Sequence, residues 1–323
     1  MYNWSSTDYS SIFPMWSVEL LNTMIKNKIT VIGSSNTDMV IKSDRLPIPG
    51  ETVIGNQFSM HHGGKGANQA VAAARLGGDV TFVCRVGNDM FGKEALDHYR
   101  QSGIDTSLIS TDPDEASGTA LILVDRLGEN SIAVALGANK NLDADLVKKA
   151  TSIIKVSSYV LTQLETPLDT VLHIGTICKT YNVPFILNPA PAAELSDELL
   201  AQVDIITPNA IEAYHLTGVK LSDLKSLQQA SSKLHNCGIQ TVIITMGEQG
   251  AYLSSYDFSG YISADHVDVV DTTAAGDTFN GALVVALCEG YKMQDAVRFA
   301  NCAAGFSVGK LGAQSSIPFR TDL

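Results

Sequence analysis

Short apolar runs alternate with helical patterns along most of this chain, and this alternation limits its possible folds more than any other sequence feature. The strand-like runs occupy residues 28–33, 80–86, 159–164, 184–187, 203–207 and 241–246. Runs with helical spacing separate most of them, at residues 65–76, 143–154, 168–181, 221–235 and 277–289. Such alternation is typical of a mostly parallel sheet with helices on both faces. We therefore predict an α/β fold whose ligands bind beyond the carboxyl ends of the strands.

Two stretches, residues 38–60 and 119–134, break this rhythm. Both alternate apolar and polar residues without a partner helix, and the second is typical of a hairpin that turns at residues 127–130. We expect them to form a small β-sheet that stands off the main domain as a lid.

The size and composition of the chain suit one large globular domain. Of its 323 residues, 45% are hydrophobic and 17% are charged, as in ordinary compact proteins. We assign the domain to residues 28–323 and treat residues 1–27 as an N-terminal extension. We hypothesise that Met24 is the natural start, and an intact mass of the natively expressed protein that includes Met1 would refute this.

The charge balance argues against two classes of partner. The net charge is −12, and no cluster of five or more Lys or Arg residues occurs. Nucleic acids and anionic membrane surfaces both need a basic footprint, so we expect neither as a partner. The five scattered cysteines are typical of buried apolar residues in a reducing compartment, and we expect a cytoplasmic protein.

The stretch VDTTAAGDTFNGALVVALCEG, residues 270–290, places small residues and one carboxylate where a helix is expected to begin. Ala274, Ala275 and Gly276 let a ligand approach the backbone closely, and the amides of a first helical turn form an anion site. Asp277 would then be a base that accepts a proton from an attacking hydroxyl. A helix cap is the structural alternative for Asp277.

A second glycine cluster, HGGKGANQ at residues 62–69, also leads into a helix of small residues. It is not a dinucleotide-binding fingerprint, because Gln69 stands where the last glycine of G-x-G-x-x-G is required. Lys65 and Asn68 offer an ammonium and an amide to hydroxyl groups, and Asn36 and Asp38 follow the first strand. These residue types suit a polyol.

The two clusters resemble the signature regions of the ribokinase-type, or PfkB, family of carbohydrate kinases. The matching stretches are GGKGANQAVAAARLG at residues 63–77 and DTTAAGDTFNGAL at residues 271–283, with NTDMV, PGET, QLETP, TPNAIEA, TMGEQG and GAQSSIP in the family's order. The resemblance covers about residues 28–320. It implies a three-layer α/β/α sandwich with a small β lid that also forms a homodimer interface. The implied reaction is phosphorylation of the 5-hydroxyl of D-ribose by MgATP, giving ribose 5-phosphate.

The resemblance also implies roles for individual residues, with Asp277 as the catalytic base. The sugar would be held by Asn36, Asp38, Gly64, Lys65, Gly66, Ala67, Asn68, Glu165 and Asp277. ATP would be held by Asn209, Thr245, Met246, Gly247, Glu248, Gln249, Gly250, Gly276, Asp277 and Asn301. The anion hole would comprise Ala274, Ala275, Gly276 and Asp277. Glu212 would be linked to Mg²⁺, and a monovalent cation, usually K⁺, would lie at Asp271, Thr273, Ser307, Lys310, Gly312 and Ser316.

The sequence departs from the family pattern at two positions, and two alternative functions remain at this point. Ser315 stands where the family often has proline, and family members vary at Glu248. The acceptor could be another sugar or a nucleoside, such as deoxyribose or fructose, because only the sugar pocket discriminates among them. A noncatalytic sugar or nucleotide sensor is the alternative of another class, and Asp277 argues against it because binding alone needs no base.

Overall fold

The computed structural model describes residues 27–323, so the hypothesis about Met24 lies outside the described residues. Its main sheet has the strand order β14-β13-β12-β11-β10-β9-β1-β4. The strands from β4 to β12 pair in parallel, whereas β13 and β14 are antiparallel. The strands are β1 (Lys28–Ile32), β4 (Asp79–Val83), β9 (Tyr159–Thr162), β10 (Phe185–Leu187), β11 (Ile205–Ile206), β12 (Thr241–Thr245), β13 (Ala251–Ser254) and β14 (Ser259–Ile262).

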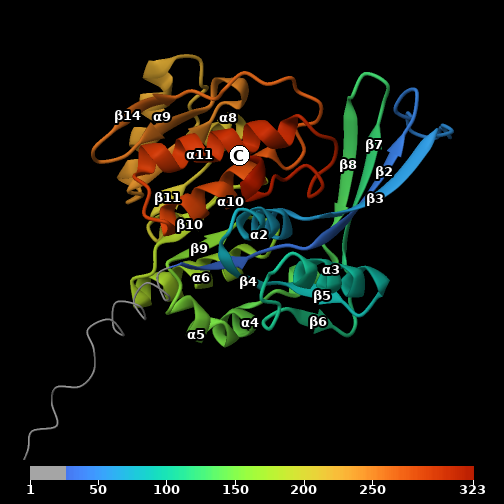
Figure 1. Ribbon diagram of the computed structural model, residues 1–323, viewed down its shortest axis with the longest axis horizontal. Coiled ribbons are helices and arrows are strands. Elements are labelled where there is room, and N and C mark those ends of the chain that lie inside the picture. The colour runs from blue at the N-terminus through green and yellow to red at the C-terminus, as the bar shows by residue number, and fades with distance from the viewer. Residues whose placement is uncertain (1–26) are drawn as a thin grey trace, which may run out of the picture.

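Helices cover both faces of this sheet (Figure 1). One face packs against α2 (Lys65–Arg75), α3 (Met90–Gln101), α10 (Ala275–Cys288) and α11 (Met293–Val308). The other packs against α4 (Ala144–Lys149), α5 (Thr151–Ile154), α6 (Leu168–Tyr181), α7 (Asp197–Leu200), α8 (Ala210–Thr217) and α9 (Leu224–Asn236). In β12, Val242 and Ile244 belong to one core and Ile243 to the other, because successive side chains of a strand point to opposite faces. The predicted three-layer α/β/α sandwich is confirmed.

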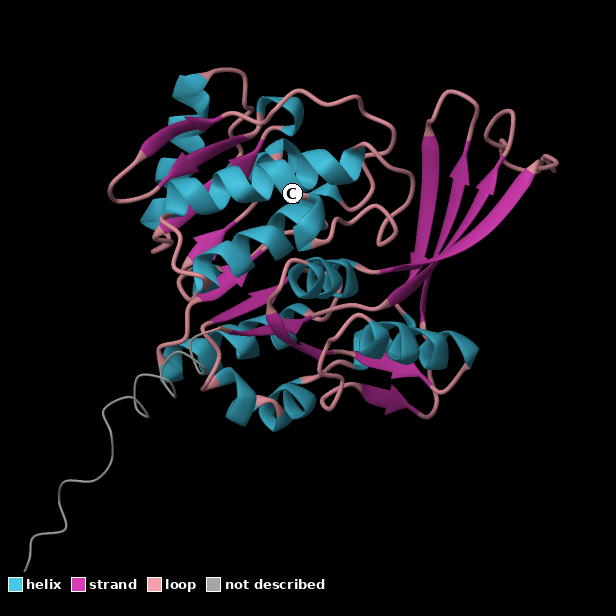
Figure 2. Ribbon diagram, viewed as in Figure 1, coloured by secondary structure: helices cyan, strands magenta, loops and turns pink. Residues whose placement is uncertain are grey.

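A separate four-stranded sheet projects from the helix-covered body (Figure 2). Its order is β3 (Gln57–Gly63), β2 (Asn36–Lys42), β7 (Gly118–Val124) and β8 (Asn130–Ala135). The β2–β3 and β7–β8 pairs are antiparallel, and β2 pairs with β7 in parallel. By this register Met39, Ile41, Phe58, Met60 and Leu121 share one face of the sheet, opposite to the face of Asp38.

The structure corrects several predicted elements. Residues 80–86 form no single strand, because β4 pairs with β1 whereas β5 (Arg85–Gly87) leaves the main sheet to pair with β6 (Ser110–Asp112). Residues 143–154 form two helices, because hydrogen bonds from Ala150 N to Val147 O and from Ile153 N to Ala150 O tighten the chain between them. Cys84 and Cys178 are buried, but Cys302 is exposed. Three short 3₁₀ helices complete the described part of the chain, η1 (Gly137–Asn141), η2 (Gly247–Gln249) and η3 (Arg320–Asp322).

Within residues 27–323, every helix is too short or too polar to span a lipid bilayer.

Helices α2 and α10 pack at very short range around Gly281. A Cβ atom at Gly281 would lie 2.5 Å from the Ala72 Cβ and 2.9 Å from the Gln69 carbonyl oxygen. Only a glycine allows the two backbones to approach this closely. The contact therefore brings together two segments that carry the two sequence clusters.

We expect Gly281→Val to lower the free energy of unfolding by about 1–3 kcal/mol, since the added methyl groups would force the two helices apart. Denaturant unfolding followed by circular dichroism measures this effect. Gly305→Ala in α11 is the control, because its Cβ would lie 3.7 Å from Val267 Cγ1, an ordinary contact. Equal unfolding midpoints for Gly281→Val and the parent would contradict the packing argument.

Candidate active site

The sequence pattern predicts a helix that begins at Asp277. In the structure α10 begins at Ala275, so Asp277 is its third residue. The preceding residue, Ala274, has φ 61° and ψ 11°, a left-handed conformation that costs a non-glycine residue about 1 kcal/mol or more. Such strain concentrates at ligand-binding turns. Among the described residues, the first-turn amides of Gly276 and Asp277 have no hydrogen-bond partner, whereas the Ala275 amide donates to Thr272 O at 3.2 Å. The Ala275 amide of the expected anion hole is therefore already hydrogen-bonded within the described part of the chain, unlike the amides of Gly276 and Asp277.

The Asp277 carboxylate is held by two amide side chains of α2. Its Oδ2 accepts from Asn68 Nδ2 and its Oδ1 from Gln69 Nε2, both at 2.9 Å. It makes no side-chain cap of α10, which removes the capping alternative. Burial raises the pKa of Asp277, although Lys65 and the two amides oppose this shift. The result is a fixed carboxylate that is more basic than an exposed one.

Gln69, which the sequence analysis treated only as a failed glycine position, has a structural role here. Its Nε2 donates to Asn188 Oδ1 as well as to Asp277, and its Oε1 accepts from Gln163 Nε2 at 2.6 Å. All of these amides are buried. A glutamine and an asparagine at consecutive positions of a small-residue helix were the sequence signal for them.

Two cavities meet at the start of α10. The first, of about 190 Å³, is lined by Lys65, Asn209, Glu212 and Asp277 among others. The second, of about 240 Å³, is lined by Thr245, Gly247, Glu248, Gly250 and Asn301 from the expected nucleotide set. Both include Thr245, Thr272, Ala275 and Gly276 in their walls.

The second cavity has residues that the sequence analysis missed, whereas Met246 and Gln249 of the expected set do not line it. The additional lining includes Ala264, Asp265, His266, Val267, Phe279 and Val308. Asn301 Nδ2 donates to Ile262 O at 2.9 Å, which ties the end of β14 to α11. The mainly apolar wall suits a flat, aromatic ligand group.

Asn209 and Glu212 form a capping box at the start of α8. Asn209 Oδ1 accepts from Glu212 N, and Glu212 Oε2 accepts from Asn209 N at 2.8 Å. Burial raises the pKa of Glu212. A carboxylate oxygen is the donor type that Mg²⁺ prefers, and each oxygen keeps a further lone pair.

Four carboxylates interact electrostatically with the Lys65 ammonium. Burial lowers the pKa of Lys65, but Asp277, Glu165, Glu212 and Asp38 together hold it above its usual value. Burial, with repulsion from Glu165 and Asp277, raises the pKa of Asp38 to about 7. The structure thus gathers Asp38, Lys65, Glu165 and Asp277 into one electrostatic unit.

The chain segment before Lys65 is held close to β2 and to Glu165. Gly64 has φ 88°, and a Cβ there would lie 2.7 Å from Asn36 N. Lys65 N donates to Glu165 Oε2 at 2.9 Å, and Ser34 Oγ donates to the same oxygen at 2.5 Å. Gly66, Ala67 and Asn68 follow in the buried first turns of α2.

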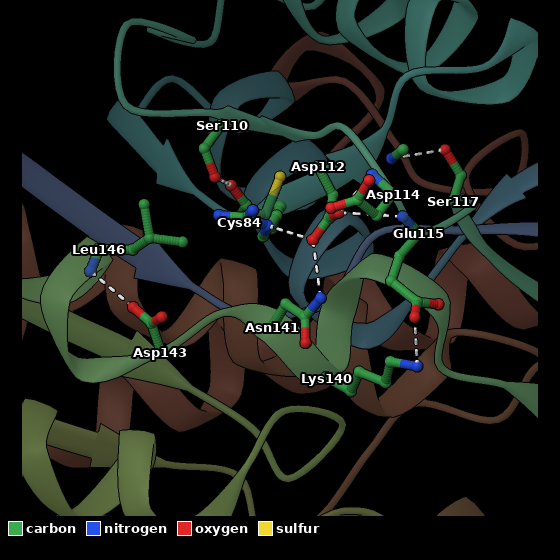
Figure 3. Close-up of polar contacts among 12 residues, drawn as sticks. Cys84, Ser110, Asp112, Asp114, Glu115, Ser117, Lys140, Asn141, Asp143 and Leu146 are labelled. Atoms are coloured by element: carbon green, nitrogen blue, oxygen red, sulfur yellow. Dashed lines mark hydrogen bonds and ion pairs between the residues drawn. The ribbon is translucent and has the colours of Figure 1, made fainter.

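Asn36 is oriented by Asn139, a residue that the sequence analysis missed. Asn139, in η1, is fully buried, and its Nδ2 donates to Asn36 Oδ1 at 2.8 Å. The base of η1 is fixed in turn, because Asn141 Nδ2 donates to Asp112 Oδ2 at 2.8 Å and Lys140 pairs with Glu115 (Figure 3). The small sheet is thereby fastened at its root beside Asn36.

The expected monovalent-cation residues lie on two adjoining loops. Asp271 Oδ1 accepts from Thr273 Oγ1 at 2.6 Å, and its Oδ2 accepts from Gly312 N at 2.8 Å. The Lys310 ammonium lies 4.3 Å from the centre of the Phe306 ring. The Ser307 and Ser316 hydroxyls donate to Ala304 O and Ala313 O. Within residues 27–323, no three His, Cys, Asp or Glu side chains gather as a metal site, so a cation here would depend on Asp271 and backbone carbonyl oxygens, which suit a hard ion.

Comparison with known proteins gives matches over nearly the whole chain. Residues 26–320 match the pfkB family of carbohydrate kinases. The ribokinase of Haemophilus influenzae is 47% identical over 298 residues, covering 92% of this chain and 97% of that protein. A deoxyribokinase of Salmonella typhi is 35% identical over 291 residues, covering 90% of this chain and 95% of that protein.

A solved structure of Arabidopsis thaliana ribokinase complexed with ribose and ATP has a TM-score of 0.87 at 32% identity. That alignment covers 91% of this chain and 96% of the other. The family match, the relatives and the shared fold agree. The chain belongs to the pfkB family of carbohydrate kinases.

Proposed function

We propose that this protein transfers the γ-phosphoryl group of ATP to the 5-hydroxyl of D-ribose, giving ribose 5-phosphate and ADP. The observation that carries the proposal is Asp277, a buried carboxylate beside the Lys65 ammonium and the unpartnered amides of α10, where two cavities meet. Similarity to a ribokinase across 92% of the chain supports ribose as the acceptor.

In this mechanism the proton of the 5-hydroxyl passes to Asp277, and the freed oxygen attacks the γ-phosphorus while ADP departs. The raised pKa of Asp277 matches the role of a base, since it accepts a proton more readily than an ordinary aspartate does. The amides of Gly276 and Asp277 would stabilise the negative charge that spreads over the equatorial oxygens.

The rest of the site would position the two substrates. Asp38, Asn36, Asn68 and Glu165 would accept from and donate to the sugar hydroxyls, and the apolar wall around Phe279 would take the adenine. Bound Mg²⁺ would neutralise charge on the ATP phosphates. Glu212 and Asn209, which line the same cavity as Lys65, would hold it directly or through water.

We expect Asp277→Asn to lower kcat by about 10²-fold to 10⁴-fold, because an amide cannot accept the hydroxyl proton. Coupled ADP-release assays measure turnover, and calorimetric titration with ribose should show that sugar binding survives. Asp295→Asn, an exposed acid on α11, is the matched control. Turnover of Asp277→Asn within a few fold of the parent would remove Asp277 as the base.

We also propose that K⁺ binds between the loops of residues 271–273 and 307–312 and orders the turn before α10. Asp271 already links these loops, and hydrogen bonds from Thr273 and Gly312 outweigh burial and lower its pKa, so its charge is kept at neutral pH.

Replacement of K⁺ by Li⁺ should therefore lower kcat several-fold with little effect on the KM for ribose, since the ion would touch no substrate. Steady-state assays in matched chloride salts test this, with Asp271→Ala as the variant that should lose the response. Equal kcat in both salts would exclude the monovalent site.

Finally, we propose a homodimer through the small sheet. The face opposite Asp38 exposes 60% of Phe58, 43% of Met60 and 56% of Leu121, and exposed apolar patches of this kind mark protein interfaces.

Leu121→Asp should convert the dimer to a monomer in light scattering coupled to gel filtration, because a carboxylate would be buried without a partner. Leu127→Asp, in the exposed turn of the hairpin, is the control and should stay dimeric. A monomeric parent protein at micromolar concentration would refute the proposal.

A further inference from the structure

A continuous chain of side-chain hydrogen bonds joins His98 of α3 to the Asp277 carboxylate. His98 Nε2 lies 2.9 Å from Gln314 Oε1, Gln314 Nε2 donates to Asn68 Oδ1 at 3.0 Å, and Asn68 Nδ2 donates to Asp277 Oδ2 at 2.9 Å. Gln314 and Asn68 are 3% and 6% exposed, so water does not compete effectively for these bonds. The chain joins four segments that are remote in sequence: α3, the loop that contains Gln314, α2 and α10.

The direction of every bond in this chain is determined. An amide oxygen only accepts, so His98 must carry a proton on Nε2 to bond Gln314 Oε1. Gln314 then presents its NH₂ group to Asn68, and Asn68 presents its own NH₂ group to Asp277. If the Gln314 amide were turned around, Asn68 would lose its partner and could rotate its oxygen toward the carboxylate.

The far end of the chain lies against the small sheet. The rings of His98 and His62, the latter on β3, are stacked with centroids 4.3 Å apart and an interplanar angle of 13°. Burial, with repulsion from His98 and His61, lowers the pKa of His62 to about 4. Burial also lowers the pKa of His98, and Arg75 adds to this shift while the bond to Gln314 opposes it. Both rings are therefore neutral at pH 7, which permits the stack.

We propose that His98 and Gln314 are positioning residues that act through Asn68 to orient the Asp277 carboxylate, and that His62 couples this orientation to the seating of β3. This inference rests on the proposed role of Asp277 as the base. Neither His98 nor Gln314 lines the two cavities described above. Both act at a distance from the substrates.

A readout other than stability distinguishes positioning from a merely structural role. The bond from Asn68 lowers the pKa of Asp277, so loosening Asn68 should move the acid limb of the kcat profile to higher pH. The charged groups that face Asp277 are Lys65, Glu165, Asp38 and Glu212, and the variants below leave all of them in place. The ratio of kcat at pH 6 to kcat at pH 8 should therefore fall.

The test compares Gln314→Leu, His98→Leu and their double variant with the parent enzyme, using ribose and ATP. We expect each single variant to lower kcat by about 10-fold, as small misplacements of reacting groups do, and to change the ribose KM by a smaller factor, because Asp38, Asn36 and Glu165 keep their positions. The double variant should be no slower than the slower single variant, because both break one chain. His98→Gln should restore kcat, since its amide nitrogen can donate to Gln314.

Two controls separate this effect from its neighbours. Ser315→Ala lies in the same loop as Gln314, and His61→Phe lies beside His62 but bonds only Ser59 Oγ in the described structure. Both should keep the parent kcat and pH profile, whereas His62→Ala should show the pH shift of His98→Leu. If Gln314→Leu fails to fold, the comparison of His98→Leu with His98→Gln tests the inference.

Parent values of kcat and of the pH 6 to pH 8 ratio in both His98→Leu and Gln314→Leu would overturn the inference. A loss of activity in Gln314→Leu that is explained by a weaker K⁺ response, with an unchanged pH profile, would also overturn it. Failure of the parent to phosphorylate any sugar would instead refute the proposed function, so the two failures are distinguishable.

Discussion

The hydrogen bonds of Asp277 to Asn68 and Gln69 are the interaction on which the rest of this site depends. They join residues that lie 209 and 208 positions apart in the chain. They are possible only because Gly281 lets α2 and α10 pack backbone to backbone. A buried carboxylate without partners would carry a large desolvation penalty, and here two neutral amides reduce it without neutralising the charge.

The electrostatics around Lys65 follow from the same arrangement. Four acidic side chains act electrostatically on one ammonium, so the site is short of positive charge before any substrate or metal ion arrives. The excess of negative charge contributes to the pKa of Asp38, which is raised to about 7. A divalent cation and a neutral polyol would both suit such a cluster, and the amides of α10 supply positive potential for the anionic phosphates without a further basic residue.

Much of the fold could be predicted from short-range pattern. The parallel core strands and α6 lie where apolar runs and helical spacing indicated, because burial on both faces demands apolar residues whatever the neighbours are. The pattern failed at residues 80–86, where an apolar run continues although the chain moves from one sheet to another. It also missed α11 and the antiparallel strands β13 and β14.

The class of fold and the motif residues could be inferred from local sequence, because small residues before a helix and a carboxylate within its first turn have local physical meaning. Which groups meet depends on how remote segments pack in three dimensions. Asn139 and His98 lie outside the quoted motifs, and Gln69 and Gln314 lie within motifs that assign them no role. Their contacts with Asp277, Asn36 and one another arise from packing between remote segments. Hydrogen bonds are short and directional, so such partners are set by the three-dimensional approach of helices and loops and not by spacing along the chain.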